Sequence, residues 1–195
     1  SSQGLGLFNN INIPNWLIIT LSVLLLDLMI YWQHRIFHLV PMFWRFHKVH
    51  HADSHIDAST GLRFHPIEIL LSILLKGLAV LLLGVPAIAV IIFEVALNGF
   101  ALFNHANIRL PRWLEYPLRA ILITQVLHRI HHSQVVEETN SNYGFSVSWW
   151  DRLFGSYKSQ AKKPDEDLDI GLKNYKADNK TATLLSLLKM PFDKN

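Results

Sequence analysis

Apolar residues gather in three long stretches of the chain, and polar residues occur only singly within them. The stretches are 14-PNWLIITLSVLLLDLMIYW-32, 67-IEILLSILLKGLAVLLLG-84 and 86-PAIAVIIFEVALNGFALF-103. Each has about the 17–25 residues that a helix needs to cross a bilayer. Buried helices of a soluble bundle usually carry a polar stripe, and these stretches carry none. The pattern therefore predicts three transmembrane helices, the last two joined by the turn Gly84-Val85-Pro86.

The rest of the chain is polar or mixed and predicts shorter elements. The segment 111-PRWLEYPLRAILITQVLHRIHH-132 is apolar but interrupted by charges near its start, which favours a helix at the membrane surface over a fourth span. From Ser156 onward the composition turns polar, and 182-ATLLSLLKMPF-192 is a short amphipathic stretch. We therefore expect an all-α fold, an integral membrane helical bundle with about three transmembrane helices, a histidine-rich helical cap and a polar tail.

Positive charge is distributed unevenly over the connections between the predicted spans. Segment 1–13 and the turn 84–86 carry no charged residue, whereas arginine and lysine recur in segments 34–65 and 105–132. Segments 34–65 and 105–132 are predicted to lie on the same side of the membrane, because the helical hairpin between them crosses it and returns. An excess of lysine and arginine marks the cytoplasmic side. The cap and the tail are therefore predicted to be cytosolic, in a bacterial inner membrane or the endoplasmic reticulum.

Composition supports a membrane protein and excludes several kinds of function. Hydrophobic residues make up 50% of the 195 residues, and the mean hydropathy of +0.21 is high for a soluble protein. The net charge of +3 is too small to indicate nucleic-acid binding. The chain has no cysteine, which excludes disulfides, thiolate metal ligands and cysteine nucleophiles. It begins SSQGLG without an initiator Met or an intact signal peptide, which leaves open whether upstream sequence is missing.

Eight of the eleven histidines fall into three tight clusters on the predicted cytoplasmic side. The clusters are His34 with His38, then His47, His50 and His51, and finally His128, His131 and His132. Residues three and four apart share one face of a helix, so each cluster can direct its imidazoles at one point. Neutral imidazole is a common ligand of zinc, iron, copper and nickel. Eight nitrogens exceed what one ion accepts, and they suit two ions with about four ligands each.

The other three histidines and one acidic residue need separate interpretations. His105 directly follows the third span at the depth of the clusters, so we expect it to be a metal ligand. His65 precedes a helix-starting proline and is either a ligand, a residue that supports one, or a helix-entry residue. His55 lies outside the helical spacing and is expected at the surface. Asp27 shares a helix face with His34, and it either accepts a hydrogen bond from a ligating imidazole or contacts a neighbouring helix.

The sequence resembles the fatty acid hydroxylase/sterol desaturase superfamily through several motifs taken together. They are HRIFH, HKVHH and HRIHH with 61-GLRFHPIE-68, 104-NHANIRLP-111, 142-NYG-144 and 149-WWDRLFGSY-157, and the resemblance covers about residues 26–157. It implies a membrane enzyme with a histidine-ligated di-iron centre on the cytosolic face, which uses O₂ and reducing equivalents to hydroxylate or desaturate lipids. The eight clustered histidines match the family's ligand motifs, and His105 matches its extra histidine. Ala101 and Arg109 stand where some relatives have another histidine, which leaves the coordination number of one metal open.

The resemblance also implies what supports the metal centre. Asn142 and Asp151 lie in the matched motifs after the last cluster, and we expect them to orient imidazoles; alternatively, one lies in a turn and the other in a helix anchored at the membrane surface. The catalytic unit is expected at residues 1–157, followed by the tail at 158–195. The implied cofactors are two iron ions, with zinc as a substitute in purified protein, and O₂. Electrons are expected from a separate reductase or carrier. No catalytic acid or base beyond the metal centre is expected.

Two other functions are compatible with the histidine clusters. A metal transporter or storage protein needs polar ligands inside the spans, where only Asp27, Lys76, Glu94 and Asn98 are available. A di-zinc membrane hydrolase needs a general base near the metal-bound water, and no carboxylate lies within the clusters. If the chain is an oxidoreductase, its substrate could be a sterol, fatty acyl, alkyl-ether or carotenoid lipid.

Overall fold

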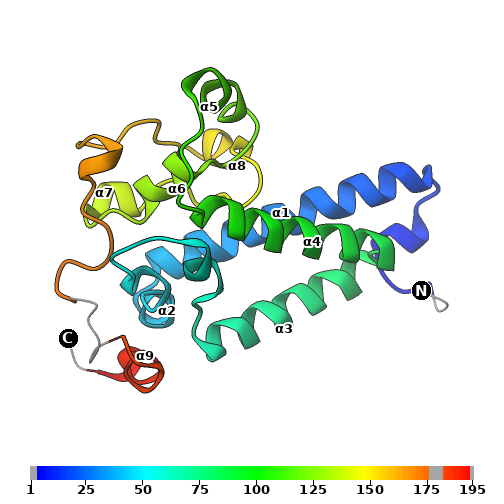
Figure 1. Cartoon of the computed structure of the whole chain (residues 1–195). Helices are drawn as coiled ribbons and strands as arrows, with labels where there is room; N and C mark the ends of the chain where they lie inside the picture. Colours follow the sequence, from blue (N-terminus) through cyan, green and yellow to red (C-terminus); the bar gives the residue numbers. More distant parts are fainter. Residues whose placement is uncertain (1–3, 176–181, 194–195) are drawn as a thin grey trace.

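The computed structural model describes residues 4–175 and 182–193, which form helices and loops with only two isolated β-bridges. Three helices are much longer than the rest: α1 (Asn15–Leu39), α3 (Pro66–Leu83) and α4 (Ala87–His105). Each is long and apolar enough to cross a membrane. Figure 1 shows these helices as a bundle, with the short helices gathered around one end. The predicted all-α fold with three candidate spans is confirmed for the described residues.

The turn between α3 and α4 closes the end of the bundle that lies away from the histidines. α3 ends at Leu83, and its C-cap residue Gly84 has a φ of +69°, in the left-handed region that favours glycine. A Cβ added at Gly84 would also lie only 3.0 Å from the carbonyl oxygen of Leu5. The short helix η1 (Leu7–Asn10) packs against α3 at this end. Glycine is therefore required both by the backbone conformation and by the close approach of the N-terminal segment.

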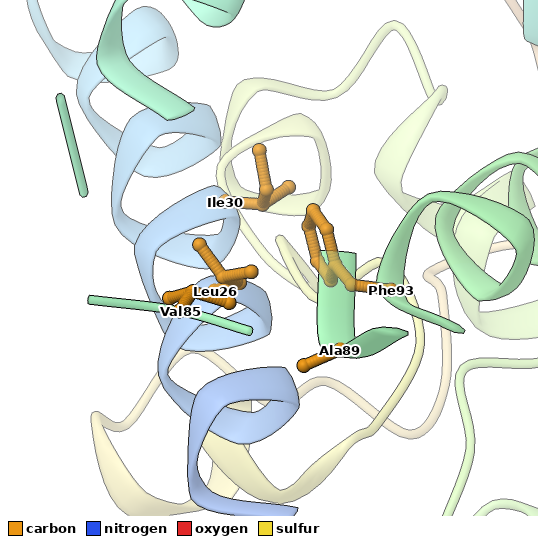
Figure 2. Close-up of a cluster of buried hydrophobic side chains, with 5 residues drawn as sticks. All are labelled: Leu26, Ile30, Val85, Ala89 and Phe93. Atoms are coloured by element: carbon orange, nitrogen blue, oxygen red, sulfur yellow. The ribbon is translucent and has the colours of Figure 1, made fainter. Parts of the chain in front are cut away.

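A small core of five side chains joins α1 to α4, as Figure 2 shows. Leu26 and Ile30 project from α1, Val85 from the turn, and Ala89 and Phe93 from α4. Lipid tails are as apolar as these side chains, so close packing holds the helices together, and a small residue such as alanine lets them approach. The core fixes α1 against α4, so the histidine-bearing ends of both helices lie at the same end of the bundle.

The outward faces of α3 and α4 are apolar and exposed. Leu74, Leu81 and Val95 expose 61%, 69% and 70% of their surface. Apolar side chains exposed along a whole helix match the hydrocarbon core of a bilayer, and a helix satisfies its own backbone groups there. These faces are therefore the ones that suit contact with lipid.

Short helices form a cap over the other end of the bundle and carry five of the eleven histidines. They are α2 (Pro41–His47), η2 (His50–Ala52), η3 (Ala58–Leu62), α5 (Arg112–Leu118), α6 (Gln125–His131), α7 (Val136–Thr139), α8 (Trp149–Leu153), η4 (Asp165–Asp167), α9 (Leu184–Lys189) and η5 (Met190–Phe192). Pro41 begins α2 after the extended residue Val40, because proline suits a first helical turn but cannot continue α1. The chain bends at this point, and α2 packs back against α1.

Segment 111–132, predicted as one interfacial helix, forms two short helices instead. α5 contains Pro117 and ends at the next residue. Leu122 then pairs with Val147 in a β-bridge, and α6 begins three residues later. Proline removes a backbone hydrogen bond and the bridge holds the chain extended, so one continuous helix cannot form. The break gives α6 its own direction and lets it pack against α4.

The polar C-terminal segment packs on the cap, whereas its composition predicts a solvated tail. The backbone N–H of Gln134 donates to the carbonyl of Asp169 at 2.8 Å, and that of Gly171 donates to the carbonyl of His132 at 3.0 Å. The amphipathic stretch 182–192 forms α9 and η5, and η5 packs against α2. Both pieces therefore cover histidine-bearing segments.

Candidate metal centre

Nine buried histidines lie together where the cap covers the ends of α1 and α4. They form two groups, and within each group one ring nitrogen per residue lies within 4.8 Å of the others. Group one contains His34, His38, His47, His51 and His131, and group two contains His50, His105, His128 and His132. The sequence predicted these nine residues as ligands, and the fold brings all of them to one end of the bundle.

Two of the three histidine clusters are divided between the two groups, although we expected each cluster to point at one place, as His34 and His38 do. His50 belongs to group two, while the flanking histidines of its cluster belong to group one. In the last cluster His131 belongs to group one and its two neighbours belong to group two. Successive residues on a helix point about 100° apart, so adjacent histidines diverge. Each of these clusters therefore contributes to both groups and links them.

The ring nitrogens are spaced as the ligands of a metal ion are. In group one, Nε2 of His34 lies 3.1 Å from Nε2 of His47. In group two, Nε2 of His105 lies 3.1 Å from that of His50 and 2.9 Å from that of His128. Nitrogens bound to one ion at about 2.0–2.1 Å lie about 2.8–3.4 Å apart for angles of about 90–109°. One ring proton cannot satisfy three nitrogens that face one another, whereas a metal ion can, so the residues fit two ions.

In three of these histidines, the second ring nitrogen donates a hydrogen bond to a backbone carbonyl. Nδ1 of His34 donates to the carbonyl of Tyr143 at 2.7 Å, and Nδ1 of His131 donates to the carbonyl of Ser141 at 2.8 Å. His105 donates in the same way to a carbonyl one turn back in α4. A carbonyl only accepts, so Nδ1 carries the proton and Nε2 keeps a lone pair for a metal. Ligating histidines are commonly oriented by such a bond.

Burial keeps the imidazoles of the cap in the neutral form that binds metal. It lowers the pKa of His131 to about 3. It also lowers the pKa of His50, His51, His128 and His132 well below the usual value, and repulsion between neighbouring imidazoles lowers it further. At neutral pH these rings are therefore uncharged and can act as ligands.

Asn142 and Asp151, which we expected to orient imidazoles, hold the loop that supplies the carbonyls of Ser141 and Tyr143. Asn142 adopts a φ of +50°, which asparagine tolerates, and its side chain bonds backbone groups of two other segments. The Asp151 carboxylate accepts the backbone N–H groups of Tyr143 and Gly144, each at 2.8 Å. A Cβ at Gly144 would lie 2.8 Å from that carboxylate, so glycine permits the approach. Both residues therefore act through the backbone of this loop, whose carbonyls accept from Nδ1 of His34 and His131.

Three other residues interpreted from the sequence lie outside both groups. Asp27 accepts the indole N–H of Trp150 at 2.8 Å and so joins α1 to α8. It precedes His34 by seven residues, about 10 Å along the helix, which is too far for a hydrogen bond to that ring. His65 is the N-cap of α3, where its Nδ1 accepts a backbone N–H, and this is the helix-entry alternative. His55 is exposed in a loop, as expected of a surface residue.

Glu68 supports the site, and sequence reasoning missed it. Its Oε1 atom accepts Nδ1–H of His47 at 2.7 Å, and both side chains are buried. Glu68 lies in the first turn of α3, three residues after the N-cap, where a glutamate ordinarily stabilises a helix start. Because glutamate is common at a helix start, the motif 61-GLRFHPIE-68 did not by itself indicate that Glu68 contacts a histidine. The structure thus places a carboxylate beside the histidines, although none lies within their clusters in the sequence.

Replacing Glu68 by leucine is expected to weaken metal binding by group one roughly 10–100-fold and to leave group two unchanged. The reason is that His47 loses the acceptor that orients its ring. Glu68→Gln keeps an acceptor oxygen without the charge, so its effect should be smaller. The measurement is the metal retained per chain after dialysis against increasing chelator concentrations. Equal losses from both groups would contradict this role.

The chain is similar in sequence to a known family and to several curated relatives. Residues 19–156 match the fatty acid hydroxylase family. The chain is 33% identical over 153 residues to ornithine lipid hydroxylase OlsE of Rhizobium tropici, which covers 78% of the chain and 45% of the relative. It is 31% identical over 143 residues to Delta(7)-sterol 5(6)-desaturase of Leptosphaeria maculans, covering 73% and 36%. It is 28% identical over 141 residues to alkylglycerol monooxygenase of Homo sapiens, covering 68% and 29%. The chain thus spans less than half the length of these relatives, and no solved structure matches it.

Proposed function

The chain belongs to the fatty acid hydroxylase family, and we propose that it is a membrane oxidoreductase that uses O₂ and two iron ions to hydroxylate or desaturate a lipid C–H bond. The observation that carries this proposal is the set of nine histidines, whose ring nitrogens converge in two groups within 4.8 Å of one another. Imidazole suits iron as well as zinc. When bound, iron supplies the redox chemistry that activates O₂. The names of the relatives support lipid oxidation.

In this proposal the chain's own residues bind the iron ions, orient the imidazole rings and shield the site from water. We assign one iron to group one and one to group two. The carbonyls of Ser141 and Tyr143 and the carboxylate of Glu68 orient the rings. The rings are buried, which keeps bulk water away from the reaction. A cavity of about 210 Å³ among the long helices is lined by His34 and His47, so a lipid can reach group one while its tail stays in the bilayer.

The reaction requires partners on the cytoplasmic side. Hydroxylation consumes O₂, two electrons and two protons, places one oxygen atom in the lipid and releases the other as water. The electrons would come from a separate reductase or carrier. A cytoplasmic site is supported by the absence of charge in segment 1–13 and the turn 84–86, since lysine and arginine gather on the other side. The catalytic unit would be residues 1–157, in a bacterial inner membrane or the endoplasmic reticulum.

One observation favours a second candidate, a di-zinc membrane hydrolase. The Oε2 atom of Glu68 is buried without a hydrogen-bond partner among the described residues, and a carboxylate near a metal site is what a general base requires. Oxidation is better supported, because the relatives named above are a hydroxylase, a desaturase and a monooxygenase. The two candidates differ in their need for O₂.

We expect membranes that contain the chain, supplied with ¹⁸O₂ and an electron source, to produce a lipid that has gained ¹⁸O or lost two hydrogens. Mass spectrometry of the extracted lipids is the measurement. Membranes with the His51→Ala variant are the matched control and should give no product, because group one then lacks a ligand. Hydrolysed lipid formed equally without O₂ would establish the hydrolase instead, and unchanged lipids despite two bound irons would contradict the proposal.

A further inference from the structure

The short helix α8 lies along the half of α1 that carries histidines. The indole N–H of Trp150 donates to Asp27 at 2.8 Å. Further along α1, the Arg35 guanidinium donates to the carbonyl of Phe154 at 3.1 Å. These two contacts are about 12 Å apart along α1, and its apolar run ends at Trp32, between them. Since α1 is apolar enough to cross a membrane, α8 lies at the level where the hydrocarbon core gives way to the lipid head groups.

The helices α5 and α8 are neighbours and expose large apolar side chains at this level. The Ser148 hydroxyl, directly before α8, donates to the carbonyl of Arg119, directly after α5, at 2.8 Å. The exposed side chains are Trp113 and Tyr116 of α5, at 76% and 64%, and Trp149 and Leu153 of α8, at 44% and 68%. Tryptophan and tyrosine are enriched where a membrane meets water. Both helices therefore suit contact with the surface of a bilayer.

A cavity of about 620 Å³ lies among α5, α6, α8 and segment 157–168. Its lining includes two tyrosines and four cations, namely Tyr116, Tyr157, Arg119, Arg152, Lys162 and Lys163. The acidic residue of the lining is Asp165, which pairs with Arg129 at 2.7 Å. Positive charge around a cavity attracts anions, and both arginine and lysine bind phosphate. The cavity therefore suits an anionic group.

Arg152 is the cation of this lining that is available to a ligand. The other three pair with carboxylates: Arg119 with Glu115, Lys162 with Glu137 and Lys163 with Asp169. None of the ion pairs among the described residues includes Arg152, which is exposed. Its guanidinium carbon lies 3.7 Å from the centre of the Tyr157 ring, and one nitrogen donates to the Arg119 carbonyl at 3.0 Å. These contacts fix the guanidinium and leave N–H donors for a further acceptor.

We propose that this cavity binds the phosphate of an anionic phospholipid through Arg152, while the exposed side chains of α5 and α8 contact the acyl chains of the same leaflet. A guanidinium presents a planar fork of donors that matches two phosphate oxygens. The occupant is a lipid because the cation stands next to exposed tryptophans and leucine at the level of the head groups. The site is separate from the metal centre and its binding needs no turnover, so the proposed function and this inference can fail independently.

Phosphatidylglycerol and phosphatidylcholine with identical acyl chains provide the test, since their head groups differ in net charge. Metal-loaded protein in detergent is mixed with equal amounts of both, and native mass spectrometry gives the ratio of the two lipids that stay bound. Wild-type protein should favour phosphatidylglycerol. Arg152→Gln should lower the ratio about fivefold, the usual effect of one cation near anionic lipid. Arg45→Gln removes the same charge from an exposed position of α2 outside this cavity, so this matched control should keep the ratio.

Metal content and melting temperature are measured for each variant, and Arg152→Met serves as a second variant if Arg152→Gln does not fold. A ratio that stays at the wild-type value in a folded Arg152 variant overturns the proposal. Equal losses in Arg152→Gln and Arg45→Gln also overturn it, because net charge alone then explains the preference. Release of phosphatidylglycerol by an excess of inorganic phosphate at constant ionic strength identifies a soluble anion as the occupant and overturns the choice of a lipid.

Discussion

His131→Ala is expected to remove one metal ion and His50→Ala the other, and each substitution is expected to abolish lipid oxidation. His131 belongs to group one and His50 to group two, so each variant breaks one site and leaves the ligands of the other in place. The loss of affinity should exceed the roughly 100-fold upper figure for losing a residue that only supports a ligand. Activity should vanish in both, because the proposed reaction requires both irons. Metal per purified chain and oxidised lipid per chain are the measurements.

His55→Ala is the matched control for these variants, because His55 is exposed in a loop outside both groups. It should keep both ions and full activity. Retention in carbonate-washed membranes shows whether each variant is still inserted. If alanine at a buried site prevents folding, His131→Gln and His50→Gln fill the space while changing the ligand. Full activity in a folded variant at either position would contradict the assignment of two iron sites.

An all-or-none result is also expected for the orientation of the spans. The chain has no cysteine, so a single introduced cysteine can be labelled without background. Ala87 is exposed at the start of α4, at the turn, and Ser159 is exposed in the polar segment that packs on the cap. A membrane-impermeant maleimide should label Ala87→Cys in intact cells, and Ser159→Cys only after permeabilisation. This result follows from the proposed topology, in which the hairpin crosses the membrane and positive charge retains the cap in the cytoplasm.

Labelling of both cysteines from the outside in intact cells would place the metal centre on the wrong side for a cytoplasmic electron donor. Labelling of neither before permeabilisation would mean that the hairpin does not cross. The long helices would then lie along one face of the membrane. Reactivity of both cysteines in detergent provides the control for accessibility.

The long helices were predictable because a membrane span requires an uninterrupted apolar run, a property of the sequence alone. α1, α3 and α4 have such runs, and the structure has them as helices. Segment 111–132 was not predictable in the same way. Its two short helices depend on tertiary partners, including the bridge between Leu122 and Val147, which lie far apart in the sequence. Short elements at a membrane surface owe more to such contacts than to their own pattern.

The nine histidines of the two groups could be found from the sequence, because eight have helical spacing and His105 follows a predicted span on the same side of the membrane. Their division into two groups could not, since it depends on where the chain bends before Pro41 and on how α6 meets α4. The hydrogen-bond acceptors that orient the imidazole rings could not be identified from the sequence either. Every residue has a carbonyl, so nothing marks those of Ser141 and Tyr143 as acceptors. The contact of Glu68 with His47 depends on how α3 packs against α2, which the sequence does not show.

The central claim is that the nine histidines form two metal sites in one chain, and native mass spectrometry tests it most directly. The mass of the folded chain, purified from cells supplied with iron, is compared with the mass of the same chain after unfolding in acid. The expected difference is two metal ions per chain, because each group offers its own set of converging ring nitrogens. A folded wild-type chain that carries one ion, or none, would contradict the claim.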